Sequence, residues 1–116
     1  MGFKEKRKAK RVDARLAITL SGGKEKAEGE TLNISTNGVY FQSPFFVEPL
    51  TKLRLELMIP QPDGRESAAK CDGIVVRVEP EREDPSVDKY NVAVFFTSID
   101  KGSQKVLTKY IMSKIS

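Results

Sequence analysis

The sequence predicts an all-β domain that ends in one α-helix. Six short stretches of alternating or continuous apolar residues follow one another, and turns rich in Gly, Pro, Asn and Asp separate them. After Asp100 the apolar residues recur with helical instead of strand spacing. Several short strands joined by tight turns are typical of a small antiparallel barrel or sandwich.

The first strand is predicted at Val12–Leu20, where an apolar side chain occupies every second position. Ser21-Gly22-Gly23 ends this alternation. Five further strands are predicted at Ala27–Ile34, Val39–Phe41, Leu53–Ile59, Ala68–Val78 and Tyr90–Phe96. Gly73 lies inside the Ala68–Val78 strand and predicts a bulge or sharp bend there. Pro62-Asp63-Gly64 predicts a tight turn, because proline presets φ and glycine accepts a positive φ.

A helix is predicted over residues 101–115. Asp100 is suited to cap its N-terminus, and lysines near its end suit the negative end of the helix dipole. The apolar residues expected to form one stripe along it are Val106, Leu107, Tyr110, Ile111 and Ile115. This stripe requires a surface to pack against, and the open end or flank of a barrel would provide it.

Positive charge is concentrated at the N-terminus. Residues 1–15 hold seven cations and two acids, whereas the rest of the chain holds 13 cations and 14 acids. We therefore expect a flexible basic arm at residues 1–11, followed by a single domain at residues 12–116. The arm has no apolar segment behind it and no run approaches the roughly 20 apolar residues of a membrane helix, so no membrane association is expected. The single Cys71 favours a reducing compartment, the cytoplasm.

The composition argues against an enzyme. The sequence has no histidine, which removes the commonest general base and metal ligand. Cys71 lies within a strand pattern and is expected to be a small buried apolar residue. The acids between Glu79 and Asp88 match no calcium-loop spacing, and no glycine-rich phosphate-binding motif occurs. We expect no metal, no cofactor and no catalytic residue.

Arginines of the basic arm provide the first candidate binding element. Arg7 and Arg11 lie four residues apart, and each planar guanidinium can grip phosphate oxygens or the Hoogsteen edge of a guanine. Arg11 and Arg15 have the same spacing. The pair Arg7 and Arg11 is preferred because Val12 then starts the strand directly, which leaves Arg15 on the polar face of the barrel. Alone, such a basic run more often indicates general affinity for polyanions.

The second candidate element is the polar segment Asn33-Ile34-Ser35-Thr36-Asn37-Gly38. Asn33 offers both a hydrogen-bond acceptor and donors, and Ser35 can hold a turn or donate to a phosphate. Gly38 allows a positive φ or the close approach of a ligand. Alone, this segment is more often a structural turn within a β-hairpin.

Taken together, the two segments resemble the signature of the PilZ domain family, RxxxR followed by (D/N)xSxxG. Arg7-x-x-x-Arg11 matches the first part and Asn33-x-Ser35-x-x-Gly38 the second. The resemblance extends over nearly the whole chain. It implies a six-stranded antiparallel β-barrel with a C-terminal helix that binds the bacterial second messenger cyclic di-GMP through Arg7, Arg11, Asn33, Ser35 and Gly38.

The expected function is that of a cytoplasmic cyclic di-GMP receptor that signals to a partner protein, as a monomer or a ligand-dependent dimer. One alternative is a PilZ-like adaptor that binds only protein, although both half-motifs are intact. Another is a small barrel that binds single-stranded nucleic acid. That function requires exposed aromatic residues as stacking platforms, and aromatic residues are only 8% of the chain. No nucleic-acid polymer is therefore expected as a partner.

Overall fold

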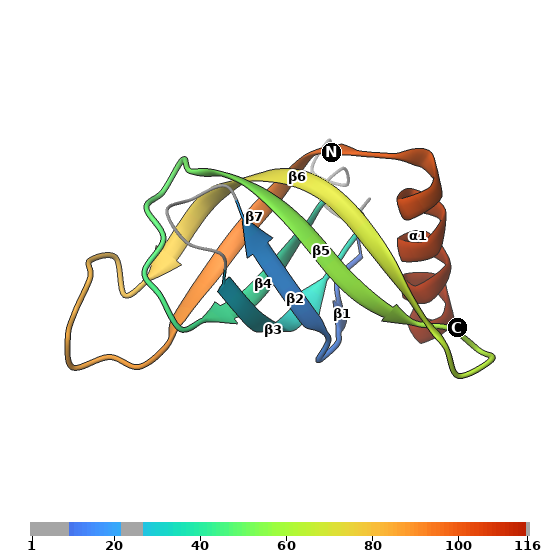
Figure 1. Ribbon diagram of the computed structural model, residues 1–116, viewed down its shortest axis with the longest axis horizontal. Coiled ribbons are helices and arrows are strands. Elements are labelled where there is room, and N and C mark those ends of the chain that lie inside the picture. Colours follow the sequence, from blue (N-terminus) through green and yellow to red (C-terminus); the bar gives the residue numbers. More distant parts are fainter. Residues whose placement is uncertain (1–9, 22–26, 116) are drawn as a thin grey trace, which may run out of the picture.

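Six antiparallel strands close into a barrel, and one helix covers an end of it (Figure 1). The computed structural model describes residues 10–21 and 27–115. The elements are β1 (Val12–Asp13), β2 (Ala17–Ser21), β3 (Ala27–Ile34), β4 (Gly38–Ser43), β5 (Lys52–Pro60), β6 (Glu66–Glu79), β7 (Tyr90–Ile99) and α1 (Lys101–Ile115). The ring runs β3-β2-β5-β6-β7-β4 and closes through β3–β4 pairing, with β1 paired beside β3. The expected barrel with a C-terminal helix is confirmed.

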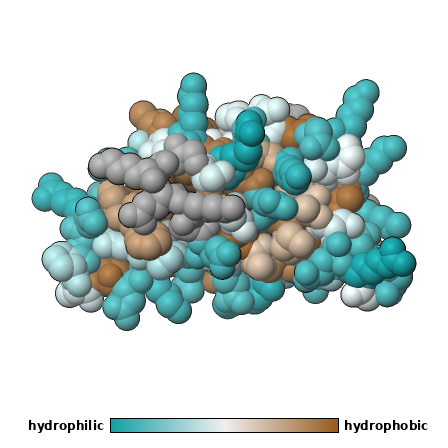
Figure 2. All heavy atoms as spheres, in the orientation of Figure 1, coloured by the Kyte–Doolittle hydropathy of each residue, from teal (hydrophilic) through white to brown (hydrophobic). Residues whose placement is uncertain are grey.

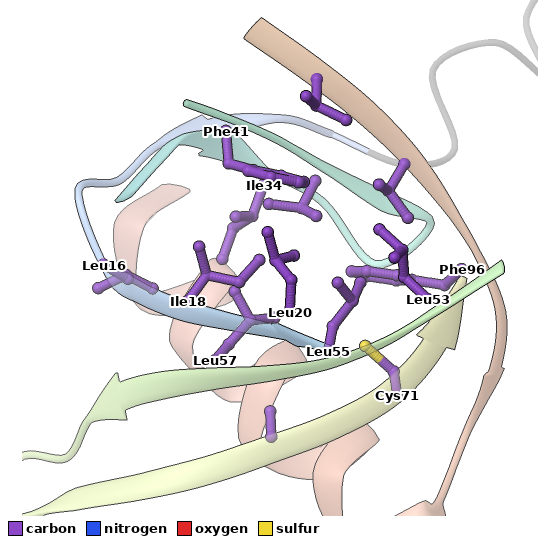
Figure 3. Packing of buried hydrophobic residues seen from close by; sticks show 14 of the residues in the cluster. Leu16, Ile18, Leu20, Ile34, Phe41, Leu53, Leu55, Leu57, Cys71 and Phe96 are labelled. Atoms are coloured by element: carbon purple, nitrogen blue, oxygen red, sulfur yellow. The ribbon is translucent and has the colours of Figure 1, made fainter. Parts of the chain in front are cut away.

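Alternation of side chains along the strands fills the barrel with apolar groups. On β5, the inward positions Leu53, Leu55, Leu57 and Ile59 are buried, while the residues between them face outward. Figure 3 shows the side chains of β2, β5 and their neighbours converging on one interior cluster. Full burial of each large aliphatic side chain contributes about 1.5–3 kcal/mol to folding. Hydrophilic side chains project around the outside, with hydrophobic patches between them (Figure 2).

The predicted strand Val12–Leu20 is broken in the middle, and this expectation was wrong in detail. Strand pairing stops after Asp13 and resumes at Ala17. The buried hydroxyl of Thr31 lies at the break: it accepts a hydrogen bond from the Leu16 amide at 2.8 Å and donates one to the Ala14 carbonyl. A side chain of β3 thus replaces part of the backbone ladder. Strand periodicity persists through such a break, because Ala14 and Leu16 still point inward.

The other predicted strands are observed, with ends that extend by at most three residues. Pairing between β6 and β7 shifts register at Asp72/Gly73, which confirms the predicted bulge. A Cβ atom on Gly73 would lie 2.9 Å from the backbone carbonyl oxygen of Phe95 and would also meet a methyl group of Val94, so any other residue here would push β6 and β7 apart. The predicted turn is also present: the Gly64 amide donates to the Gln61 carbonyl at 3.0 Å, and Gly64 has φ 90°.

Helix α1 begins where the sequence predicts. The Asp100 carboxylate accepts hydrogen bonds from the amide and hydroxyl of Ser103, and these bonds lower the pKa of Asp100. Leu107 and Ile111 are buried against the barrel, and α1 contacts mainly β6 and β5. Ile115 was expected in this stripe but is 41% exposed, because it lies at the last residue of the helix. No helix in the described residues is long and apolar enough to cross a membrane.

Replacing Thr31 with valine should destabilise the barrel. Valine keeps the shape of the side chain but leaves the Leu16 amide and the Ala14 carbonyl without their buried partner. We expect a loss of about 1–3 kcal/mol in the free energy of unfolding, measured by urea denaturation. Thr97→Val, at an exposed position of β7, is the matched control and should change stability by less than about 0.5 kcal/mol. Equal stability of the two variants would contradict a bridging role for Thr31.

Candidate ligand-binding site

The turn between β3 and β4 is organised around a buried serine. Ser35 is 2% exposed, and its Oγ accepts hydrogen bonds from the amides of Asn37 at 3.0 Å and Gly38 at 3.2 Å. Its own amide donates to the Gly38 carbonyl at 2.9 Å. These bonds form the serine turn that the local sequence allows. Ser35 therefore shapes the site and presents little surface of its own to a ligand.

Gly38 is required by the packing of two strands. A Cβ atom at this position would lie 2.3 Å from the Val94 carbonyl oxygen of β7, which is backbone and cannot move aside. The Phe96 amide of β7 also donates to the Asn37 carbonyl at 2.8 Å. The turn is consequently held from within by the hydrogen bonds of Ser35, and it is held to β7 through the Asn37 carbonyl. Asn37 is left exposed at its tip.

Arg11 and Asn33 meet on the surface beside this turn. Arg11 Nη1 donates a hydrogen bond to Asn33 Oδ1 at 2.7 Å, although 22 residues separate them in the sequence. The contact follows from β1–β3 pairing, which sets Val12 opposite Ile34 and Asp13 opposite Asn33. Among the described residues, no further hydrogen bond is made by the other guanidinium donors of Arg11 or by the side-chain NH2 group of Asn33.

The other arginines are placed differently. Arg15 is exposed, and its guanidinium lies 3.8 Å from the Glu30 carboxylate, on the outer face of the barrel. Arg7 lies outside the described residues. Of the five residues expected to bind ligand, the structure therefore brings together Arg11, Asn33, Ser35 and Gly38.

Sequence reasoning did not include two polar residues of the barrel wall. Cross-strand pairing aligns Asn33 with Tyr40, Tyr40 with Ala93, and Ala93 with Arg77. Directly paired residues of antiparallel strands share a face, so these four form a row that leads from Asn33 across the outside of the barrel. Tyr40 and Arg77 thus add an aromatic ring and a second cation to the candidate surface. In the sequence, strand alternation indicates only that both side chains point outward. Their position beside Asn33 becomes clear only when the strand register is known.

Tyr40 is held in place by an acid on β6. Its hydroxyl donates to Glu79 Oε1 at 3.0 Å. Burial raises the pKa of Tyr40, and the hydrogen bond to Glu79 raises it further, so the phenol is neutral at physiological pH. The ring is therefore an uncharged surface with a fixed orientation, which suits stacking against a heterocycle.

Cys71 belongs to the core of the barrel. It is 5% exposed, and burial raises the pKa of its thiol to about 12, with smaller contributions from the charges of Asp72 and Asp100. A thiol with this pKa is protonated at neutral pH and is a weak nucleophile. In the part of the chain that the structure describes, no cluster of Cys, Asp and Glu side chains is arranged to hold a metal ion.

The small antiparallel barrel with its capping helix defines the class of fold, and comparison with known proteins identifies the family. The PilZ domain model matches residues 5–113, so the chain belongs to the PilZ domain family. A comparison with functionally characterised proteins gives no match by sequence.

Solved structures share this fold. The inhibitor of motility MotI/DgrA from Bacillus subtilis superposes with a TM-score of 0.76 at 21% identity, over 94% of this chain and 51% of that one. This chain thus spans about half the length of MotI/DgrA. The PilZ domain of YcgR from Escherichia coli, solved with c-di-GMP, superposes with a TM-score of 0.69 at 11% identity, over 94% of this chain and 91% of that one. At these identities the likeness concerns the fold.

Replacing Gly38 with alanine should destabilise the protein even without ligand. The new methyl group would meet the Val94 carbonyl and force β4 away from β7. We expect the free energy of unfolding to fall by about 3 kcal/mol in urea denaturation. Gly102→Ala in α1 is the control, because its Cβ would meet only ordinary contacts, and it should change stability by no more than about 1 kcal/mol. Unchanged stability of Gly38→Ala would show that the strands separate freely.

Cys71 should resist alkylation in the folded protein. At about pH 8, iodoacetamide reacts with the thiolate, which is scarce at this site because the thiol is buried and its pKa is about 12. We expect labelling, followed by mass spectrometry, to be at least about tenfold slower in native buffer than in urea. Equal rates in the two conditions would mean that β6 is open to solvent.

Proposed function

We propose that this protein is a bacterial, cytoplasmic receptor for cyclic di-GMP, without catalytic activity, whose nucleotide-bound form is recognised by a partner protein. The hydrogen bond from Arg11 to Asn33 carries this proposal, because it joins the arginine motif to the polar turn on one surface. Family membership and the c-di-GMP in the YcgR PilZ structure support the identity of the ligand.

The chemistry of the two arginines matches the two kinds of group in the ligand. Each guanidinium can form paired hydrogen bonds with phosphate oxygens or with O6 and N7 of guanine. Arg11 already uses one donor on Asn33, which orients its plane and leaves other donors for the nucleotide. Arg7 lies four residues closer to the N-terminus and provides the second guanidinium. We assign both as ligand-binding residues.

The turn and the barrel wall complete the proposed site. Asn33 offers its amide group to a guanine edge, while Ser35 and Gly38 hold the turn that positions it. The row from Asn33 through Tyr40 to Arg77 gives the purine rings a surface on which to stack.

Signalling would follow from folding of the basic N-terminal arm over the nucleotide. Charge-assisted hydrogen bonds contribute roughly 1.5–3 kcal/mol each, so those of two arginines offset an ordering cost of a few kcal/mol. The closed arm and the bound nucleotide would form a surface that is absent without ligand, and a partner protein would read it. A monomer with one nucleotide and a dimer around two nucleotides both fit this mechanism.

A PilZ adaptor that binds no nucleotide is the second candidate, and one observation favours it. Ser35 and Gly38 are both explained by the fold alone, through the turn hydrogen bonds and the contact with Val94. An intact NxSxxG segment would therefore persist in a chain that had lost its ligand. Arg11 and Asn33 distinguish the candidates, because both are accessible and the barrel interior does not need them.

Titration calorimetry with cyclic di-GMP tests the receptor proposal, with GTP and GMP as controls. Arg7→Ala and Arg11→Ala should each lower affinity at least about tenfold, since each removes charge-assisted hydrogen bonds. Arg15→Ala is the matched control and should have little effect, because Arg15 faces Glu30 on the outer wall.

The variants also separate the two assignments of the arginine motif. A larger loss with Arg15→Ala than with Arg7→Ala would assign the motif to Arg11 and Arg15 instead. If the wild-type protein at high concentration gives no heat of binding with cyclic di-GMP, and the nucleotide does not change the free energy of unfolding, the adaptor is favoured. The molar ratio at saturation would report whether one nucleotide or a pair is bound.

A further inference from the structure

The mouth of the barrel opposite α1 contains a preformed apolar cavity. Its volume is about 740 Å³, within the range of ligand-binding pockets. The loops β4–β5 and β6–β7, which project at this end in Figure 1, form its walls. The turn of Ser35 lies at the other end of β4, so the cavity is distinct from the proposed nucleotide site.

Hydrogen bonds anchor both loops at their bases. The Ser43 hydroxyl donates to the Phe45 carbonyl at 2.7 Å and accepts from the Phe45 amide at 3.0 Å. The Tyr90 hydroxyl likewise accepts from the Asp84 amide at 2.9 Å and donates to the Asp84 carbonyl at 3.1 Å. Phe46 packs edge-on against Tyr90, with ring centroids 5.5 Å apart. A cavity with walls held in this way requires little ordering before it binds.

The cavity walls select an apolar occupant. The hydroxyls of Ser43 and Tyr90 are already bonded to backbone, and no buried polar side-chain atom among the described residues lacks a partner. Leu20, Leu53 and Phe46 line the interior, and Phe45 stands at the edge with 49% of its surface exposed. An aromatic or branched aliphatic side chain would bury the exposed part of Phe45.

The charges around the opening of the cavity favour a positively charged partner. Glu48, Glu83 and Asp84 line the opening. The β6–β7 loop also carries Glu81 and Asp88, which with Glu83 and Asp84 outnumber its two cations, Arg82 and Lys89. None of these carboxylates forms an ion pair with another described residue. A local excess of acids attracts cationic partners and repels acidic ones.

We propose that this mouth, lined by Phe45 and rimmed by Glu48 and Glu83, binds a segment of a partner protein in which an apolar side chain is flanked by lysines or arginines. The apolar side chain enters the cavity, and its cationic neighbours lie against the acidic rim. The proposal does not depend on nucleotide binding, because the cavity and the turn of Ser35 lie at opposite ends of β4.

A pair of labelled peptides tests this proposal by fluorescence anisotropy, without nucleotide. One carries phenylalanine and leucine flanked by lysines, and the other has glutamates in place of the lysines. We expect the basic peptide to bind and the acidic one not to bind. Phe45→Asp and Glu83→Lys should each weaken binding of the basic peptide at least about tenfold.

Matched controls lie at the opposite end of the barrel. Met112→Asp alters a similarly exposed apolar residue of α1, and Glu66→Lys makes the same charge change as Glu83→Lys. Both should bind the peptide like the wild type, and circular dichroism checks that every variant is folded. Equal weakening by the controls, or no binding by the wild type, would overturn the proposal. Concentration-dependent dimerisation abolished by Phe45→Asp would assign the mouth to a second copy of this chain and also overturn it.

Discussion

The close approach of β4 to β7 at Gly38 is the constraint on which the barrel depends. Strand β4 closes the ring, because it pairs with β3 on one side and with β7 on the other. Glycine allows the backbones of β4 and β7 to come close, and the hydrogen bonds of Ser35 hold the turn that leads the chain between β3 and β7. Without this turn, β3 and β7 would both present unpaired edges, which are costly and prone to aggregation.

The same turn also forms the proposed nucleotide site, so closure of the fold and recognition share residues. Ser35 and Gly38 work inside the architecture, whereas Arg11 and Asn33 stand on its surface. Selection for a stable barrel would preserve the first pair whether or not a ligand binds. Arg11 and Asn33, the accessible residues of the motif, consequently carry more information about function than the buried Ser35 and Gly38.

Strands and helix could be predicted because alternation and helical spacing are local properties of the sequence. The break near Ala14 could not, since it arises from the Thr31 hydroxyl, which is distant along the chain. Arg11 and Asn33 were predicted from motif spacing, and their contact is observed, while Arg7 lies outside the described residues. Arg77 was missed because its place beside Tyr40 and Asn33 depends on the register of three strand pairs.

The Thr31 bridge also bears on the proposed nucleotide site, because it holds the chain close to Arg11. By fixing Ala14 and Leu16, it gives the preceding residues a rigid anchor only three positions after Arg11. A side chain on so short a tether explores a small volume, so its effective concentration near Asn33 is high. Part of the entropy cost of assembling the proposed binding surface would thus be met when the barrel folds, before any nucleotide binds.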